Sequence, residues 1–433
     1  MVVVFASQSV GATGRRLSLN EALSLAKESN YQILIARSQL DKAEGQNLEG
    51  WQAFLPRLVL SEGYMRSDEP VAVFGTKLRQ GIFSADDLAL DALNNPDPIT
   101  NFATVIRLEQ PIINIDAING KRSAGSAKKA SEYALDRTEE TIALEVEKAY
   151  YGLILSNGNL ATIDDAVETA RIHYNEVKSA HDKGLVSKAD LLSSQVQLAE
   201  MTEHRLTAKL NIANASDQLK FLLGLEEVAE IIPTDSLFVP EADRLVTEVP
   251  LDTIPAGRSD LLSLHYQNEA ASRGVWRRRG EWIPRLNAFG ITEWHDENLF
   301  GTSKNHWTVG VLLEWSVFDG LGQWGRKNQA NALAAATRIR YREAQARSSM
   351  EVRQAYRGLV TARERMDVAE QAVEQSRESL RIIEARFQKG LERVSDLLTR
   401  ESAYTGAQLR LQRAMYDFKV ARSELQFYLG AAD

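Results

Sequence analysis

The chain has 433 residues, of which 44% are hydrophobic and 25% charged, and this composition excludes an intrinsically disordered protein. A net charge of −8 without a long basic run argues against nucleic-acid binding. The absence of cysteine excludes disulfides, thiolate metal sites, cysteine nucleophiles and lipidation on cysteine.

The N-terminal segment, residues 1–16, reads MVVVFASQSVGATGRR, a short apolar run followed by small residues. This pattern resembles the last part of a secretory signal whose basic start is missing. A plain disordered N-terminus fits it equally well. No stretch of the sequence reaches the eighteen or so consecutive apolar residues of a membrane helix.

Proline positions delimit the helices of the first half of the chain, residues 17–224. Proline costs roughly 3 kcal/mol inside a helix, and residues 112–232 contain none. Apolar residues three and four apart predict one very long helix and two shorter ones. We place these helices at about 19–54, 118–180 and 188–223. A β-hairpin at about 57–112 and a turn at about 181–188 connect them.

The second half, residues 258–433, follows a linker at 225–257 that holds four prolines. The same reasoning predicts a second set of elements in the same order. These are a helix at about 259–281, a hairpin at about 285–318, a long helix at about 324–387, a turn at about 387–395 and a helix at about 395–429.

The two halves are internal repeats of one unit. The turn HDKGLVSKADLL at 181–192 matches FQKGLERVSDLL at 387–398, and the same offset of 206 residues relates EVEKAY at 145–150 to EVRQAY at 351–356. Such self-similarity decides the architecture. In each turn a glycine, Gly184 or Gly390, suits a left-handed helix cap, and Ser187 or Ser395 is placed to cap the next helix.

The predicted strands have one apolar side. In WTVGVLLEWSVF, residues 307–318, every second residue from Trp307 to Val317 is apolar, and the intervening positions are mostly polar or small. The segment 101–112 alternates similarly. Strands of nine to eleven residues with one apolar face and aromatic ends are typical of transmembrane β-barrels. The edge of a soluble β-sandwich is the alternative interpretation.

Tryptophan positions favour the membrane interpretation. Six of the seven tryptophans lie between Trp276 and Trp324, around the second hairpin. Indole rings favour the membrane interface. Four strands cannot close a barrel, and open sheet edges are not tolerated in hydrocarbon, so several chains must combine. For the helices alone, a soluble elongated coiled-coil scaffold remains the alternative.

The sequence contains no catalytic motif: there is no nucleophile elbow, Walker loop, dinucleotide fingerprint or HxxxH pair. We therefore predict no enzyme activity, cofactor or resident metal. His295 and His306 flank a loop between strands and suit a metal, but exposed loop histidines are far commoner.

These landmarks together resemble the TolC-type outer-membrane efflux proteins, the outer-membrane factors. The resemblance rests on LPRL and IPRL opening the hairpins, LEQPIIN and LEWSVFDG closing them, and two G-L-x(4)-D-L-L turns, and it covers about residues 17–430. It implies a homotrimer with a twelve-stranded β-barrel in outer-membrane lipid, four strands per chain, continuous with a long α-helical barrel, a tunnel, in the periplasm. It implies a passive duct that works with a periplasmic adaptor and an inner-membrane pump.

The resemblance also assigns roles to residues. The two turns become the periplasmic tips of the tunnel, and the loop at about 67–100 becomes extracellular, covering part of the barrel mouth. The tip residues implied to dock the adaptor are Gly184, Leu185, Val186, Ser187, Gly390 and Leu391. The implied membrane-interface aromatics are Trp282, Trp294, Trp307 and Trp315.

Asp396, with Asp190, is implied to form the pore constriction at the closed end of the tunnel. A solvated aspartate at a helix start fits Asp396 as well. The sequence departs from the family pattern at Thr399, where a second aspartate is expected, and at Phe387 and Glu392, where the closed-state latch has tyrosine and arginine. That latch therefore cannot form unchanged.

Overall fold

The computed structural model describes residues 15–225, 230–244 and 257–430. Most of the predicted N-terminal segment 1–16, and much of the linker 225–257, lie outside the described residues. The chain divides into two compact units. We call them the helical unit (Met1–Gln39, Glu132–Leu262 and Arg342–Asp433) and the sheet unit (Leu40–Ser131 and Ser263–Tyr341).

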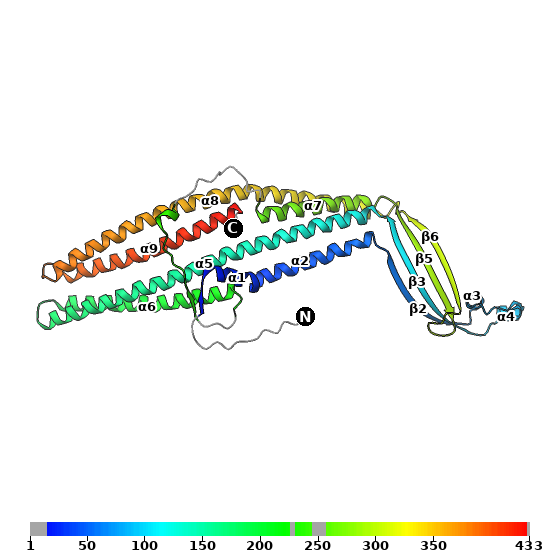
Figure 1. The fold of residues 1–433 in the computed structure, drawn as a ribbon, viewed down its shortest axis with the longest axis horizontal. Coiled ribbons are helices and arrows are strands. Elements are labelled where there is room, and N and C mark those ends of the chain that lie inside the picture. Colours follow the sequence, from blue (N-terminus) through cyan, green and yellow to red (C-terminus); the bar gives the residue numbers. More distant parts are fainter. Residues whose placement is uncertain (1–14, 226–229, 245–256, 431–433) are drawn as a thin grey trace. The chain divides into compact units, whose positions relative to one another are not determined.

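Long helices dominate the helical unit (Figure 1). The predicted long helices are confirmed: α5 has 68 residues and α8 has 66, so each extends roughly 100 Å at 1.5 Å per residue. The helices outside the β2–β3 connection are α1 Leu19–Ser29, α2 Tyr31–Glu49, α5 Ile115–Asp182, α6 Lys188–Leu222, α7 Ser259–Gly280, α8 Gly322–Phe387 and α9 Val394–Leu429. Of these, α2, α5, α7 and α8 each have residues in both units, and most of α7 belongs to the sheet unit. Among the described residues, none of these helices is both long and apolar enough to cross a bilayer.

Two antiparallel pairs of helices form the core of the helical unit. In the first, Tyr150 and Leu153 of α5 pack against Leu219 of α6 and against Leu17 of β1 (Arg15–Leu17), which pairs in parallel with β4 (Ile231–Pro233). In the second, Leu359 and Met366 of α8 pack with Phe418 of α9; Figure 1 shows these two helices running side by side. Each fully buried large side chain contributes roughly 1.5–3 kcal/mol.

The single helix predicted over 19–54 is wrong in two respects: it breaks at Asn30, and α2 ends at Glu49, before a 3₁₀ turn at Gly50–Ala53. The Asn30 backbone is extended, and its side-chain Oδ1 accepts hydrogen bonds from Gln32 N at 2.9 Å and Ile33 N at 3.4 Å. Its Nδ2 donates to Leu222 O at 2.8 Å. Asn30 thus accepts hydrogen bonds from backbone N–H groups in the first turn of α2. A side-chain oxygen is favoured at this position because these N–H groups have no partner within the helix.

The sheet unit contains one antiparallel sheet of four strands in the order β2-β3-β5-β6. The strands are β2 Arg57–Ser67, β3 Ile99–Ile113, β5 Arg285–Asp296 and β6 Lys304–Glu314. The register pairs Leu58 with Leu108 and Gly290 with Val309. Arg285, from the IPRL landmark, forms an ion pair with Asp116 at 2.5 Å, which fixes the start of β5 to the start of α5.

Two predicted boundaries are wrong. The strand predicted over 307–318 ends at Glu314, because β5 begins at Arg285, the partner of Glu314, and offers no backbone beyond it. Trp315 and Val317 therefore lie outside the strand. Ser395 does not cap α9: the helix already begins at Val394, after Arg393 in the extended conformation.

The connection between β2 and β3, residues 68–98, is folded. It contains α3 (Pro70–Gln80), a short 3₁₀ turn and α4 (Leu90–Asn94). Glu69 caps α3 by accepting hydrogen bonds from Val71 N and Ala72 N, and Gly81, at φ 70°, ends the helix. Lys77 Nζ forms an ion pair with Asp87 at 2.6 Å, which ties the 3₁₀ turn to α3.

Candidate functional site

One face of the four-stranded sheet is apolar. The antiparallel register places alternate residues of all four strands on this face. Trp307, Val309, Val311 and Leu313 of β6 are all exposed, as are Leu58, Leu60 and Tyr64 of β2. We call this side the apolar face; its apolar members are Leu58, Leu60, Tyr64, Phe102, Ile106, Leu108, Leu286, Ala288, Trp294, Trp307, Val309, Val311 and Leu313. The same register places Glu62, Arg66 and Asp296 on this face, at the end near the 297–303 turn.

The opposite side, the polar face, carries most of the charges of the sheet. Its members are Arg57, Asn101, Arg107, Glu109, Arg285, Glu293, His295, Lys304, His306, Thr308 and Glu314, among smaller and apolar residues. The outer strands β2 and β6 each have only one neighbour, so one backbone edge of each is unpaired within the chain. An exposed apolar face with unpaired edges is unstable in water as an isolated surface.

The predicted interface tryptophans lie at two levels of the β5–β6 hairpin. Trp294 and Trp307 are near the 297–303 turn, whereas Trp282 and Trp315 are at the other end, where Trp315 Nε1 donates to Trp282 O at 3.2 Å. Trp307 and Trp315 are eight residues apart, roughly 26 Å of extended chain. This spacing suits the apolar band of about 25 Å that aromatic girdles flank in membrane barrels.

The structure brings the two repeated turns together. Gly184 and Gly390 adopt φ 74° and 67°, the left-handed conformation predicted for both. Beneath them Val177 of α5 packs with Val394 and Leu398 of α9. Val186 joins this cluster, as does Phe387. A small apolar cluster therefore holds the ends of the two helical hairpins side by side.

Each of the two turns exposes one leucine side chain. Leu185 is 75% exposed and Leu391 is 64% exposed, at equivalent positions of the two repeats. Ser187 is the N-cap of α6, and it forms reciprocal hydrogen bonds with Asp190. Two exposed leucines on these turns are suited to contact a partner protein, because exposed apolar surface gains free energy when it is buried.

The two aspartates predicted to line a constriction have different surroundings. Asp190 Oδ2 accepts from Ser187 Oγ at 2.6 Å, so this carboxylate is occupied in the capping box. Asp396 lies in the first turn of α9 and is exposed, without such a bond. Phe387 and Glu392 occupy the positions where the family has the latch tyrosine and arginine. Glu392 forms an ion pair with Arg386 of its own hairpin at 2.7 Å, and Phe387 packs in the cluster beneath the turns.

A histidine–glutamate pair, which the sequence did not reveal, joins the two helical hairpins above the turns. His173 Nε2 of α5 lies 2.7 Å from Glu401 Oε1 of α9, and His173 Nδ1 lies 3.0 Å from Glu176. Glu401 is almost fully buried. The hydrogen bond with Glu401, reinforced by the negative charge of Glu401 and Glu176, raises the pKa of His173 to about 9.

This pair predicts a pH dependence of stability. The pKa of His173 is raised in the folded chain from an ordinary value near 6.5, so its contribution is fully present below pH 6.5 and is lost as the pH rises towards about 9. We expect the free energy of unfolding of the helical unit to fall by at most about 3 kcal/mol between pH 6 and 9.5. Urea titration followed by circular dichroism measures it. His173→Gln should remove most of this change; an unaltered pH profile in the variant contradicts the assignment.

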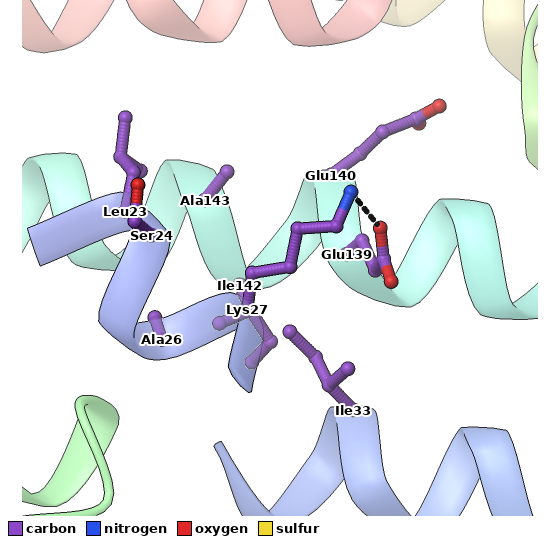
Figure 2. Close-up of a pocket in the computed structure, with 9 residues that line it drawn as sticks. All are labelled: Leu23, Ser24, Ala26, Lys27, Ile33, Glu139, Glu140, Ile142 and Ala143. Carbon is purple, nitrogen blue, oxygen red and sulfur yellow. Dashed lines mark ion pairs between the residues drawn. The ribbon is translucent and has the colours of Figure 1, made fainter. Parts of the chain in front are cut away.

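A pocket of about 270 Å³ lies in the helical unit between α1, the start of α2 and α5. Figure 2 shows Lys27 reaching from α1 to Glu139 of α5, an ion pair of 2.8 Å, with apolar side chains such as Ile33 and Ile142 around it. Glu140 accepts from Arg137 and Ser259. Neighbouring groups therefore neutralise the charges of the lining.

His295 and His306 of the sheet each lie within hydrogen-bond distance of another protein group. His295 Nδ1 lies 3.1 Å from Asn101 Nδ2, and His306 Nε2 lies 2.9 Å from Arg79 O. Within the part of the chain that the structure describes, no group of three histidine, aspartate or glutamate side chains is arranged to hold a metal ion.

Comparison with known proteins identifies the family to which this architecture corresponds. The family described as "Outer membrane efflux protein" matches residues 22–225 and 251–431. The alkaline protease secretion protein AprF of Pseudomonas aeruginosa is 22% identical over 422 residues, covering 96% of this chain and 85% of AprF. The outer membrane protein TolC of Vibrio cholerae is 22% identical over 444 residues, covering 99% of this chain and 95% of TolC.

Solved structures agree in fold. The Campylobacter jejuni CmeC outer membrane channel superposes with a TM-score of 0.81 at 18% identity, over 95% of this chain and 85% of CmeC. The outer membrane protein VceC of Vibrio cholerae gives a TM-score of 0.78 at 17% identity, over 95% of this chain and 96% of VceC. The resemblance inferred from the repeats and hairpins is thereby confirmed, and the comparisons favour a channel over a soluble coiled-coil scaffold.

Proposed function

Since the chain belongs to the outer membrane efflux protein family, we propose that three copies form one channel, with a twelve-stranded barrel in the lipid and a helical tunnel below it. The chain is an outer-membrane exit duct for efflux or secretion, and its helical part lies in the periplasm. The family consists of outer-membrane channels and not of enzymes.

The observation that carries this proposal is the sheet with an apolar face and two unpaired edges. Unpaired backbone groups are not tolerated in hydrocarbon, so β2 of one copy must pair with β6 of the next. Three copies of four strands then close a cylinder, whose apolar face meets lipid and whose polar face encloses water. The internal repeats at 17–224 and 258–433 supply two hairpins of strands and two of helices to each third of the channel.

The assembly is tested by fractionation and by electrical recording. The full chain should be extracted from outer membranes only with detergent, and it should migrate as an SDS-resistant trimer that dissociates on boiling. Purified trimers should open ion-conducting pores in planar bilayers. A monomer that stays dissolved without detergent contradicts the proposal.

In this assembly the tunnel is passive, and an inner-membrane pump supplies the free energy of transport. The paired turns form the periplasmic tips and dock the periplasmic adaptor. Their exposed residues Leu185 and Leu391, together with the backbone at Gly184, Val186, Ser187 and Gly390, make the contact surface. The left-handed glycines matter because a side chain with Cβ is strained at φ near 70°, so the turns keep a fixed shape.

The exposed carboxylate of Asp396 narrows the tunnel near these tips. Three copies around the threefold axis concentrate negative charge and attract cations. We expect Asp396→Ala to weaken the block of single-channel current by divalent or trivalent cations at least several-fold. Asp217→Ala, which removes an exposed aspartate of α6, is the matched control and should leave the blocking affinity unchanged. Equal block in wild type and Asp396→Ala rules out this constriction.

A further inference from the structure

The helix α3 has two faces of opposite character. Val73, Thr76 and Gln80 are buried, whereas Val71, Phe74 and Leu78 are exposed on the other side of the helix. At 100° per residue the buried residues fall within one 60° sector, and the exposed ones lie roughly opposite. Ile82, just beyond the helix, is also apolar and exposed. We call Val71, Phe74, Leu78 and Ile82 the α3 stripe.

The buried side of α3 is attached to the polar face of the sheet. Gln80 Nε2 donates to Asn101 Oδ1 at 3.0 Å and to Thr100 O at 2.8 Å. His306 Nε2 donates to Arg79 O at 2.9 Å. The register places both Asn101 and His306 on the polar face. The end of α3 is therefore anchored on that side of the sheet, at the end where β5 turns into β6 (Figure 1).

The glycine that ends α3 reinforces this attachment. A Cβ added at Gly81 would lie 2.5 Å from Lys304 Cε, and Lys304 also belongs to the polar face. Gly81 at φ 70° thus permits a close approach of the helix end to β6.

On the opposite side of α3, Phe74 packs against Phe83 in a T-shaped pair with ring centroids 5.0 Å apart. Val71 and Leu78 remain 76% and 49% exposed, so much of this apolar side is uncovered. In the proposed channel the polar face encloses the pore, so the α3 stripe, which points away from the sheet, faces the pore axis. Threefold symmetry then brings three copies of the stripe towards one another. A helix with side chains is about 10–12 Å across, so three of them occupy much of the mouth of a twelve-stranded barrel.

We propose that the α3 stripes of three subunits meet at the outer mouth and form a hydrophobic constriction of the pore. The partner of each stripe is a second copy of this chain. This inference rests on the proposed trimeric channel, with which the interface is continuous. A hydrophobic constriction restricts ion flow by excluding water. It can open for large cargo without the loss of strong polar contacts.

Cross-linking tests the encounter between stripes. The chain has no cysteine, so Leu78→Cys introduces a single thiol. Trimers of this variant, oxidised in membranes, should give a disulfide-linked dimer that disappears on reduction. Thr76→Cys, on the buried side of the same helix, is the control and should not cross-link. Absence of the Leu78→Cys dimer from stable trimers overturns the proposal, and means that the stripe faces lipid or medium.

Conductance tests the constriction. Val71→Ser combined with Leu78→Ser should raise the single-channel conductance at least twofold, because water enters a polar mouth more readily. Leu90→Ser, which changes an exposed leucine of α4 outside the stripe, should leave the conductance unchanged. Unchanged conductance in the double variant overturns the constriction even if the stripes cross-link. Wild-type protein that forms no trimeric pores instead refutes the proposed channel, and the constriction with it.

Discussion

Replacing Val309 by arginine is expected to abolish stable trimers in the outer membrane. Val309 lies at the middle of β6 on the apolar face, and its side chain is 68% exposed. An arginine facing lipid at the bilayer midplane costs about 2–4 kcal/mol. A trimer carries three, roughly 6–12 kcal/mol in total, which is comparable to the whole stability of a typical domain. The measurement is the amount of SDS-resistant trimer in the outer-membrane fraction.

The neighbouring residue provides the matched control. Thr308 is exposed on the same strand but on the polar face, so Thr308→Arg places the same charge in the water-filled interior. Trimers of this variant should form normally, and their pores should become less selective for cations. Equal loss of trimers in both variants means that insertion into the membrane does not depend on which face of the sheet carries the arginine. Normal trimers of Val309→Arg mean that the apolar face does not lie in lipid.

The elements that were predicted correctly are those that depend on a regular spacing of apolar residues or on a single local residue type. Alternation from Trp307 to Leu313 predicts an apolar side, because successive side chains of any strand point to opposite faces. The long helices α5 and α8 were predictable since both segments lack proline and repeat apolar residues at helical spacing. The left-handed turns at Gly184 and Gly390 followed from local glycine chemistry.

Boundaries set by distant partners were not predictable. β6 ends at Glu314 because its partner β5 begins at Arg285, although the apolar alternation of the sequence continues to Val317. The helix break at Asn30 depends on a hydrogen bond to Leu222 O, 192 residues away. Neither boundary can be predicted from a local pattern, because each depends on a residue that is distant along the chain.

The same limit applies to side-chain pairs. His173 and Glu401 lie in different repeats and meet only because α5 and α9 pack against each other. The attachment of α3 depends on Gln80, Asn101 and His306, which occupy three separate elements. The existence of the two turns, by contrast, was predicted from repetition alone, because the same motif recurs in the sequence at an offset of 206 residues.

Replacing Leu185 and Leu391 together by aspartate is expected to abolish docking of the adaptor while leaving the channel intact. Both side chains are mostly exposed in the chain, so their loss removes few internal contacts. A trimer presents six such leucines. Burying an unpaired carboxylate at a protein interface costs several kcal/mol, whereas burying a leucine is favourable, so the two effects add at every tip. We expect the recovery of adaptor with cross-linked trimers from intact cells to fall at least tenfold.

Leu185→Met combined with Leu391→Met is the matched control, because methionine keeps the apolar surface and nearly the same volume. This variant should retain adaptor at close to the wild-type level. The aspartate variant should still yield SDS-resistant trimers that conduct in planar bilayers, since the cluster of Val177, Val394 and Leu398 beneath the turns is untouched. Full recovery of adaptor with the aspartate variant places the docking surface away from the turns, and loss of trimers in that variant shows that the leucines stabilise the channel itself.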